Sequence, residues 1–404
     1  MNSGNHKLRV LLVNKFYRRG GGDCIHFLAL EKLLRDHGHD VAVLTMHHPD
    51  NLPLPSGSFE VSQVSINGGI ADRINAASRI LGGYGVRSSV KEAITSFRPD
   101  IVHLHNIHSY LSPAVAQVAK GSGVPVVWTL HDYKLVCGAY TCLQNGHPCT
   151  ECLSSSPTAI LRHRCMKNSV TASLLAFAES RKWHSRKIER LTDIFICPSA
   201  FMRDKMTEGG FAPEKLRVLN NFIPSLPEVE GKSLPRSGVC YIGRLSPEKG
   251  VGYLLEAAVR AGWNLTVAGS GPQENELKER FGNAVNINFV GHLDAIDVAR
   301  LLSRSVVSVV PSICFENNPL AAIESLCYGT PVAGADIGGI PELIGKGNGI
   351  LFTPRSSEAI VTAVNEALTG KWNHEEIATA ARLRFAPEEY YSSVIGLYGS
   401  IAST

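Results

Sequence analysis

Two carboxylates near the end of the chain have the spacing and setting of a polar ligand site. Glu316 is expected in a loop, and Glu324 lies eight residues later, inside the helix that should follow. Asn318 suits the N-cap of that helix and Pro319 its first position, which leaves free backbone N–H groups at a positively polarised end. Such an end attracts phosphate, while ionised carboxylates accept hydrogen bonds from sugar or ribose hydroxyls. The alternative is a solvated loop residue followed by an ordinary surface charge.

Two cations lie in another loop, after an apolar run. Residues 239–242 read as a buried strand, and Gly243, Arg244 and Lys249 follow it. A planar guanidinium and a compact ammonium five residues apart could together neutralise a diphosphate leaving group. The alternative is a solvated loop with ordinary surface cations.

Glycines follow predicted strands in both halves of the chain. Gly20, Gly21 and Gly22 come after the apolar run 8–13. They either make a tight turn or let a diphosphate or acceptor approach the backbone, and the neighbouring arginines 18 and 19 favour the second reading. In the second half, Gly269 and Gly271 lack the third glycine of the G-x-G-x-x-G fingerprint, which argues against a nicotinamide dehydrogenase.

Polar side chains also follow two strands of the first half. His131 comes at the carboxyl end of the predicted strand 124–130, where parallel sheets bind ligands. A neutral imidazole there could hydrogen-bond a sugar hydroxyl. His105 and Asn106 follow the strand 101–104 and, with Tyr133, are candidates for an acceptor pocket. The alternative is that these histidines are structural or surface residues.

A cysteine cluster lies directly after His131. Its members are Cys137, Cys142, Cys149, Cys152 and Cys165. Cys149 and Cys152 form a C-x2-C pair, and with Cys137 and Cys165 they supply four thiolates that can surround zinc tetrahedrally. Cys142, His147 or His163 could replace one of these ligands. A metal would stabilise a loop that has little apolar content, whereas the alternative is a set of unligated thiols.

The overall composition is that of an ordinary globular chain. A length of 404 residues predicts two or three domains, with 44% hydrophobic and 19% charged residues. We expect no signal peptide, because the apolar run 8–13 is short and is followed by Asn14 and Lys15, and no run approaches a membrane span. Ten cysteines then favour reduced thiols or metal ligands over disulfides, which predicts a cytoplasmic protein.

Positive charge concentrates in the first half. Residues 1–205 hold 24 Lys and Arg against 15 Asp and Glu, a charge of +9; the totals of 40 and 36 leave 16 against 21, or −5, for the remainder. The densest basic stretch, residues 162–190, is interrupted by apolar side chains and could lie on an anionic membrane surface. Its alternative is a surface helix whose apolar face belongs to the core. No nucleic-acid-binding motif accompanies the charge.

Short apolar runs alternate with amphipathic segments along the whole chain. The runs expected to be strands are residues 8–13, 41–44, 101–104, 124–130, 194–197, 239–242, 265–268, 287–290, 306–310, 331–334 and 349–352. This order predicts an α/β fold of parallel sheets with helices on both faces. Ligands of such sheets bind at the carboxyl ends of the strands, and the carboxylate pair, the two cations, both glycine segments and His131 all follow predicted strands.

With these motifs in this order, nearly the whole chain resembles the family-4 retaining glycosyltransferases, whose two Rossmann-like domains face each other (the GT-B fold). The resemblance implies an N-terminal acceptor-side domain at residues 1–205 with the cysteine-rich insertion at 137–165. It implies a nucleotide-sugar-binding domain at 206–384 and a last helix within 385–404 that crosses back to the first domain. One subgroup of the family carries a similar cysteine-containing insertion.

The resemblance also implies roles for individual residues. Arg244 and Lys249 would bind the donor diphosphate, and Glu324 its ribose. Glu316 would hold the transferred sugar, which His131 would face from the other domain. The other donor-side positions expected are Gly20, Gly21, Gly22, Gly243, Gly269, Gly271, Asn317, Asn318, Pro319 and Leu320.

We therefore expect a retaining transfer from a nucleotide-diphosphate sugar to a hydroxyl of a glycan, a lipid-linked acceptor or a small molecule, in surface polysaccharide or glycoconjugate synthesis. The sequence contains no D-x-D pair, which predicts chemistry without a catalytic divalent metal. One alternative is a sugar-nucleotide epimerase, which would convert the donor without an acceptor. Another is a non-catalytic, membrane-associated scaffold with a vestigial donor site.

Overall fold

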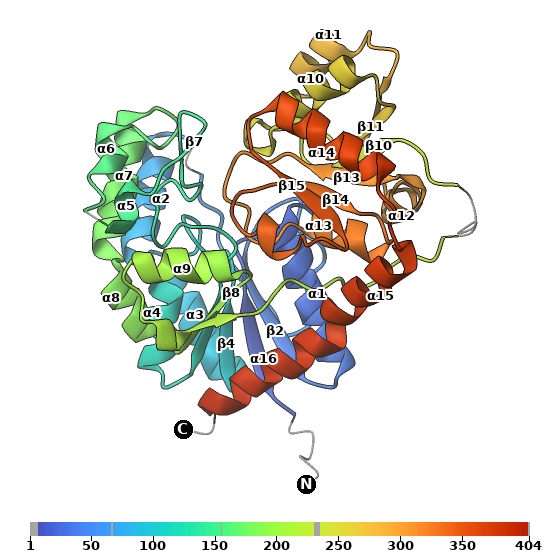
Figure 1. The fold of residues 1–404 in the computed structure, drawn as a ribbon. Coiled ribbons are helices and arrows are strands. Elements are labelled where there is room, and N and C mark those ends of the chain that lie inside the picture. Colours follow the sequence, from blue (N-terminus) through green and yellow to red (C-terminus); the bar gives the residue numbers. More distant parts are fainter. Residues whose placement is uncertain (1–6, 66–67, 155, 230–234, 403–404) are drawn as a thin grey trace. The chain divides into compact units, whose positions relative to one another are not determined.

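The computed structural model describes residues 7–65, 68–154, 156–229 and 235–402. The chain separates into two compact units, each built on its own parallel sheet (Figure 1). The first unit comprises Met1–Cys142, Cys149–Asn220 and Tyr390–Thr404, and the second comprises Leu143–Pro148 and Asn221–Glu389. The domain limits expected after residues 205 and 384 stay predictions.

The sheet of the first unit has seven parallel strands in the order β3-β2-β1-β4-β5-β8-β9. The strands are β1 (Arg9–Val13), β2 (Asp40–Met46), β3 (Phe59–Val61), β4 (Ile101–Leu104), β5 (Val126–Thr129), β8 (Ile194–Cys197) and β9 (Leu216–Val218). The strands β4, β5 and β8 are buried along their whole length. Burial on both faces explains why such strands read as unbroken apolar runs in the sequence.

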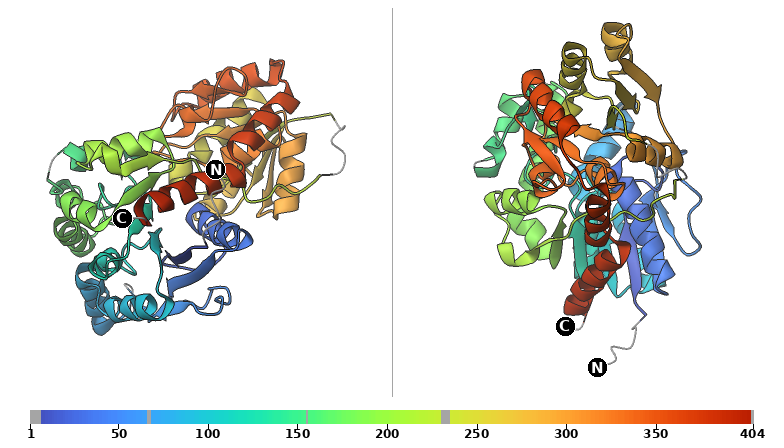
Figure 2. Two further views of the ribbon diagram at one scale, coloured as in Figure 1. Left: turned by 90° about the horizontal axis from the view of Figure 1, so that it is seen from below. Right: turned by 45° about the vertical axis from the view of Figure 1, so that its right-hand side comes forward.

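Helices flank this sheet, as the views in Figures 1 and 2 show. They are α1 (Gly22–Asp36), α2 (Ile70–Gly82), α3 (Val86–Phe97), α4 (Ala114–Gly121), α5 (Glu151–Ser154), α6 (Ala159–Arg162), α7 (Val170–Lys182), α8 (Ser185–Leu191), α9 (Ala200–Glu208) and the 3-10 turn η1 (Pro213–Lys215). The last helix, α16 (Pro387–Ala402), belongs to this unit from Tyr390 onward. Its tyrosines 390 and 398 are buried there.

The sheet of the second unit has six parallel strands in the order β12-β11-β10-β13-β14-β15. The strands are β10 (Val239–Ile242), β11 (Leu265–Ala268), β12 (Ile287–Gly291), β13 (Val307–Val310), β14 (Val332–Ala335) and β15 (Gly349–Phe352). The helices are η2 (Pro247–Lys249), α10 (Val251–Ala261), α11 (Glu274–Phe281), α12 (Ala295–Arg304), α13 (Leu320–Cys327), η3 (Ile340–Glu342), α14 (Ser357–Thr369) and α15 (His374–Arg384). Helix α10 packs on α14 and α13 on α15, closing one continuous apolar core.

Strand register decides which loops meet. In the first unit β1 lies beside β4 with Val13 opposite Leu104, so the loops that begin at Asn14 and His105 emerge together. In the second unit β10 lies beside β13, with Val239 opposite Val307. The loops carrying the cations and the carboxylates therefore start from neighbouring strands.

The predicted α/β fold with parallel sheets is confirmed, and all eleven expected strands occur with ends that differ by at most two residues. The sequence analysis missed four short strands, because two or three residues carry no periodicity: β3, β9 and the hairpin of β6 (Leu143–Gln144) with β7 (His147–Pro148). In the part of the chain that the structure describes, no helix is both long and apolar enough to cross a membrane.

Candidate functional site

A short ion pair lies at the carboxyl ends of β10 and β13. The Lys249 ammonium contacts Glu316 Oε1 at 2.6 Å, and the Ser312 hydroxyl donates to the same oxygen, also at 2.6 Å. The two loops are tied together because the Ile313 N–H donates to the Glu248 carbonyl at 3.0 Å. The Glu316 side chain is only 12% exposed and that of Lys249 30%.

Both members of this pair are charged at neutral pH. Burial alone would raise the pKa of Glu316, but the Lys249 charge and the hydrogen bonds from Lys249 and Ser312 outweigh it and lower that pKa. Burial would lower the pKa of Lys249, yet the charge of Glu316 raises it. The sequence placed these two residues in one site with separate roles; the structure brings them into direct contact.

Glu324 has a contrasting environment. It is half-buried in α13, and among the described residues its carboxylate has no hydrogen-bond or ion-pair partner. Burial alone raises its pKa to about 7. An acid left in this state gains most from hydroxyl donors that stabilise its charged form, which is what a diol offers.

The start of α13 differs from the prediction by one residue. We expected Asn318 as N-cap and Pro319 as the first helical residue; the N-cap is Pro319 and the helix begins at Leu320. Asn318 was wrong as the cap because its side chain has another partner: its Oδ1 accepts the Asn221 N–H at 2.8 Å. Asn318 is buried, and its Nδ2 has no partner in the described part of the chain. Asn317 lies beside it, between Glu316 and the cap.

Arg244 is not brought into contact with Lys249. Its side chain is exposed, and its guanidinium forms no ion pair or hydrogen bond with any described residue. Only its backbone is held, since the Tyr241 hydroxyl donates to the Arg244 carbonyl at 2.9 Å. The site in the second unit thus contains one paired cation and one unpaired cation.

Three predicted glycines of the second unit leave little room for a side chain. A Cβ at Gly269, whose φ is +134°, would lie 1.9 Å from the Gly243 carbonyl oxygen. A Cβ at Gly271 would lie 2.3 Å from the Leu245 carbonyl oxygen, and one at Gly243 would lie 2.8 Å from the Tyr241 hydroxyl. The contacts at Gly269 and Gly271 hold the loops after β10 and β11 against each other, whereas that at Gly243 is with a side chain of β10.

The glycine run that begins at Gly20 in the first unit has more open surroundings. A Cβ at Gly20 would meet nothing within 4 Å, and one at Gly21 only the Asp23 carboxylate at 3.1 Å. Gly21 is the N-cap of α1, Gly22 is its first residue, and all three glycines are exposed. Packing therefore does not explain this glycine run, and the space beside it is open.

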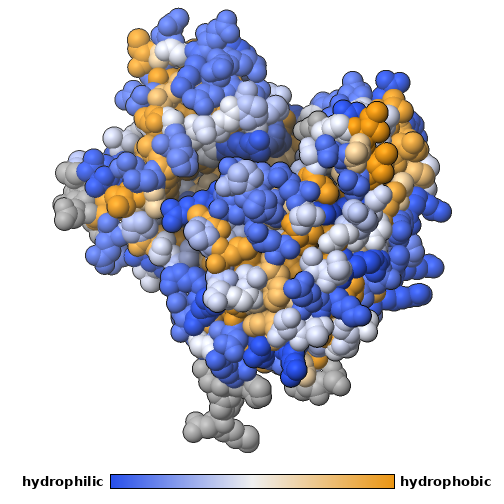
Figure 3. Space-filling view, turned by 180° about the vertical axis from the view of Figure 1, so that it is seen from behind, coloured by the Kyte–Doolittle hydropathy of each residue, from blue (hydrophilic) through white to orange (hydrophobic). Residues whose placement is uncertain are grey.

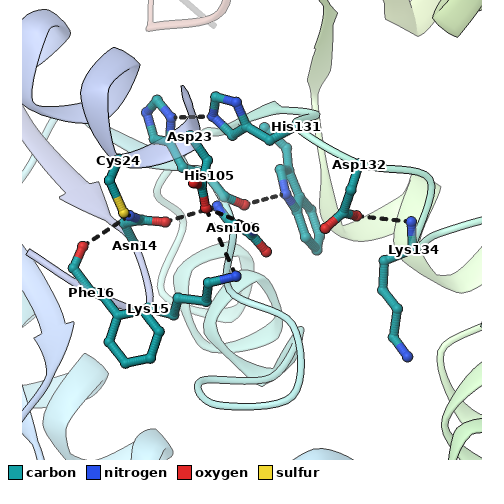
Figure 4. Close-up of polar contacts among 11 residues, drawn as sticks. Asn14, Lys15, Phe16, Asp23, Cys24, His105, Asn106, His131, Asp132 and Lys134 are labelled. Carbon is teal, nitrogen blue, oxygen red and sulfur yellow. Dashed lines mark hydrogen bonds and ion pairs between the residues drawn. The ribbon is translucent and has the colours of Figure 1, made fainter. Parts of the chain in front are cut away.

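A polar network joins the loops after β1 and β4 (Figure 4). Asp23, in the first turn of α1, accepts from Asn106 Nδ2 at 2.9 Å and lies 3.8 Å from the Lys15 ammonium. Asn14 Oδ1 accepts the Asn106 N–H at 3.1 Å. Burial alone would raise the pKa of Asp23, but Lys15, His131 and the Asn106 hydrogen bond lower it, so the carboxylate is charged.

Four histidines from three elements gather beside this network. His131 Nε2 lies 3.0 Å from His105 Nδ1, and the ring of His26, from α1, lies 5.4 Å from that of His131. The His103 ring stacks on His105 at 4.5 Å. Residues of α16 hold the outer members: the Tyr390 hydroxyl is 3.1 Å from His26 Nε2, and that of Tyr398 is 2.6 Å from His103 Nδ1.

These histidines are neutral. Burial lowers the pKa of His131 to about 4 and that of His103 to about 3, and it lowers the pKa values of His26 and His105 well below the usual range. His105 Nε2 is buried without a partner among the described residues. A buried donor without an acceptor costs more than an unused lone pair, so we infer that His105 carries its proton on Nδ1 and donates to His131 Nε2.

The neighbours of His131 along the chain differ in setting. Asp132 Oδ1 accepts the Lys134 N–H at 2.9 Å, and burial raises the pKa of this carboxyl (Figure 4). The Lys134 ammonium forms a buried ion pair with Glu179 of α7 at 2.9 Å. Tyr133 is 2% exposed, and its backbone carbonyl accepts the Cys137 N–H at 2.7 Å. The Tyr133 side chain therefore lies in the core, under the start of the cysteine loop.

The cysteine loop brings thiols near one another without forming a disulfide. All five of its cysteines are free. A hydrogen bond from Cys142 lowers the pKa of Cys137 to about 6, and burial with the nearby thiols of Cys137 and Cys165 raises that of Cys152 to about 12. His163 lies 3.0 Å from Glu151. Within the described residues, no group of three or more His, Cys, Asp or Glu side chains is arranged to hold a metal ion.

Sequence reasoning missed several members of these sites, namely Asn14, Lys15, Asp23, His26 and Ser312. Lys15 and Asp23 flank the glycine run that was singled out, and His26 lies one turn further into α1. The signal of Asn14, Lys15 and Ser312 was position, since each lies just beyond the carboxyl end of a parallel strand, whereas Asp23 and His26 lie inside α1. The links from α16 to the histidines, 295 and 364 residues apart in sequence, had no local signal.

Two parallel sheets with strand-end loops of this kind define the class of protein. Solved structures of similar fold include a sucrose-phosphate synthase from Thermosynechococcus elongatus, with TM-score 0.71 and 18% identity over 98% of this chain and 100% of that one. They also include Anabaena Alr3699/HepE in complex with UDP and glucose, with TM-score 0.67 and 16% identity over 98% and 100% of the two chains. The fold is that of the GT-B glycosyltransferases.

Sequence comparison narrows this class to a family. Residues 20–225 match the model of Glycosyltransferase Family 4, and residues 223–384 match that of Glycosyl transferases group 1. A glycogen synthase of Mycobacterium tuberculosis is 28% identical over 96% of this chain and 92% of its own length. The chain belongs to glycosyltransferase family 4, which confirms the predicted resemblance.

Proposed function

We propose that this protein is a retaining glycosyltransferase that moves a sugar from a nucleotide-diphosphate sugar to an acceptor hydroxyl in polysaccharide or glycoconjugate synthesis. The observation that carries the proposal is the Lys249–Glu316 contact of 2.6 Å at the carboxyl ends of β10 and β13. The helix α13, which carries Glu324, begins four residues after Glu316. A similar solved structure was determined with UDP and glucose, which supports a nucleotide-sugar donor.

The donor roles follow from the charges of this site. Arg244 is unpaired and exposed, so it can meet a phosphate without first losing a partner. Lys249 would share its charge between Glu316 and the leaving diphosphate, and the first N–H groups of α13 would add to it. Glu316 and the backbone of 317–320 would hold the sugar, while Glu324 would accept from the ribose hydroxyls. The unused Asn318 Nδ2 is a further donor beside them.

We propose no protein nucleophile. The bond between the anomeric carbon and the diphosphate oxygen breaks, the acceptor oxygen bonds to the same face of that carbon, and the acceptor proton passes to the departing phosphate. Lys249 and Arg244 would stabilise the charge that develops on the diphosphate, so no catalytic divalent metal is required in this scheme. His131, neutral and held by His105, would hydrogen-bond the transferred sugar, and Asn106 with Asp23 would bind acceptor hydroxyls.

The reaction itself tests the proposal. Purified protein incubated with a panel of nucleotide sugars and glycan acceptors, in the presence of a chelator, should release nucleoside diphosphate only when an acceptor is present. The anomeric configuration of the product, read by NMR, should match that of the donor. Conversion of the donor without acceptor would instead identify an epimerase, and inversion would remove the retaining assignment.

We also propose a structural zinc in the cysteine loop, held by Cys137, Cys149, Cys152 and Cys165. The donor set is suitable, because thiolates are common ligands of structural zinc, and the thiols of Cys137, Cys149 and Cys165 lie near enough to Cys152 to help raise its pKa. The described conformation does not itself converge on a metal, so binding would draw the thiols together. Metal analysis of purified protein should find about one zinc per chain, and the double variant Cys149→Ser with Cys152→Ser should lose it. A wild-type protein that is purified without metal and is not stabilised by added zinc would contradict this.

The location that fits the basic first half is the inner face of a membrane, on which a cytoplasmic enzyme could reach a lipid-linked acceptor. The excess of 24 Lys and Arg over 15 Asp and Glu in residues 1–205 supports an anionic surface as a partner.

A further inference from the structure

Four branched apolar side chains of the first unit lie in solvent. Ile70 is 80% and Ile74 60% exposed on α2, and Val170 is 58% and Leu174 56% exposed on α7. Each pair is spaced by four residues, so its members lie on one face of their helix. We call these four residues the α2–α7 patch.

The two helices that carry the patch pack side by side. The Trp183 indole, at the end of α7, donates to the Ile80 carbonyl near the end of α2 at 3.0 Å. The carboxyl ends of these two helices of 13 residues therefore meet. The two exposed pairs thus lie on adjacent helices, from segments 100 residues apart. Figure 3 shows apolar side chains gathered at its upper right, on the side where α2 and α7 lie.

The border of the patch is cationic. Arg73 lies between the two isoleucines of α2, and Arg162, Arg164 and Lys167 precede α7 and are exposed. The Met166 N–H donates to the Ser173 hydroxyl at 3.1 Å, which holds this basic segment against the first turns of α7. Two carboxylates are near, namely Asp72, which is exposed and accepts the Gly69 N–H, and Glu151, which pairs with Arg162, so four cations against two carboxylates leave a net charge of +2. Arg164 and Lys167 form no ion pair with any described residue.

We propose that the α2–α7 patch inserts into an anionic lipid surface. Aliphatic side chains at the centre enter the boundary of the acyl chains, and the cations around them meet lipid phosphates. This inference deepens the membrane association proposed above and is independent of the transfer chemistry. The membrane-binding surface then includes α2 as well as the basic stretch of residues 162–190. The isoleucines of α2 are the most exposed side chains of the patch.

The interaction can be tested with the full-length protein and vesicles. Wild type should float with vesicles of phosphatidylcholine containing about one third phosphatidylglycerol and bind them at least about tenfold more than phosphatidylcholine alone. Ile74→Asn with Leu174→Asn should reduce this binding about tenfold or more. A matched control, Val285→Asn with Leu383→Asn, changes exposed apolar residues of the second unit and should bind as wild type does.

Folding and donor binding separate this inference from the proposed function. Both double variants alter exposed side chains, so their thermal unfolding and their stabilisation by a nucleotide sugar should match wild type. Equal vesicle binding by the patch variant, or no wild-type binding to anionic vesicles, would overturn the inference. So would a wild-type dimer that the patch variant converts to monomer in light scattering, because the occupant would then be a second copy of the chain.

Discussion

The two strand-end sites of this protein differ in the charge of the side chains at their centres. In the second unit, Lys249 and Glu316 are both ionised and 2.6 Å apart, and a second carboxylate, Glu324, has no partner among the described residues. In the first unit, burial keeps the four histidines neutral, and His131 has a pKa of about 4. Similar sheets thus support one site centred on a short ion pair and one in which neutral histidines lie beside a charged carboxylate, Asp23.

The difference fits the two halves of a glycosyl transfer. A diphosphate carries charge that must be matched by cations, whereas sugar hydroxyls need donors and acceptors that do not change their protonation with small changes in pH. The second unit can do the former with Lys249 and Arg244. The first unit can do the latter with His131 and Asn106.

Removing the ion pair should have the largest effect. Lys249→Ala takes away a cation from the diphosphate site and leaves Glu316 buried without its counter-ion. We expect transfer to fall by roughly 10²- to 10³-fold and unfolding free energy by about 3 kcal/mol. Steady-state kinetics and urea unfolding measure these. Lys278→Ala, which breaks an exposed pair with Glu274, is the control and should change neither quantity. Full activity of Lys249→Ala would show that the ion pair has no part in transfer.

The glycines of the two sites should also differ in their effect on stability. Gly269→Ala should destabilise the second unit by about 3 kcal/mol or more, because the new Cβ would overlap the Gly243 carbonyl at a φ of +134°. Gly20→Ala meets no atom within 4 Å and should leave thermal unfolding unchanged. If substrate approaches that loop, Gly20→Ala should nevertheless reduce transfer. A stable Gly269→Ala protein would contradict the packing explanation.

Acid should destabilise the first unit through its histidines. The pKa of His131 is lowered from 6.5 to about 4, so the unfolded chain binds its proton more readily. The stability that neutral His131 confers is fully present above pH 6.5 and is lost as pH falls toward 4, by up to about 3 kcal/mol. His131→Asn should flatten this part of the profile in urea unfolding between pH 4 and 8. An unchanged slope would mean that the histidine is not held neutral.

Glu324 should have the smallest effect on stability, and its dependence on pH should be opposite to that of His131. Its pKa is raised to about 7, so its charged form is disfavoured in the fold and wild-type stability falls as pH rises from 4.5 through 7. Glu324→Gln should therefore stabilise the protein at pH 8 by about 1–2 kcal/mol. The same change should weaken donor binding, since an amide accepts ribose hydroxyls less strongly. Destabilisation at pH 8 would show that Glu324 has a partner in the folded protein.

Much of the fold followed from the sequence because buried parallel strands such as β4 and β10 are uninterrupted apolar runs. Glu316, Lys249 and His131 were found for the same reason, since each follows such a run. The Lys249–Glu316 contact could not be predicted, because it depends on the order of strands in the sheet. The tyrosines of α16 against the histidines, and the α2–α7 patch, join distant segments whose pairing only the tertiary structure determines.

The central claim is that a nucleotide-diphosphate sugar binds the charged site of the second unit. Its most direct test is thermal unfolding of wild type, Arg244→Ala and Glu324→Ala with a panel of nucleotide sugars. We predict that at least one nucleotide sugar raises the unfolding temperature of wild type. Glu324→Ala should lose most of this rise, and Arg244→Ala should show a smaller rise than wild type because one phosphate contact is missing. No shift with any donor, or equal shifts in all three proteins, would contradict the account.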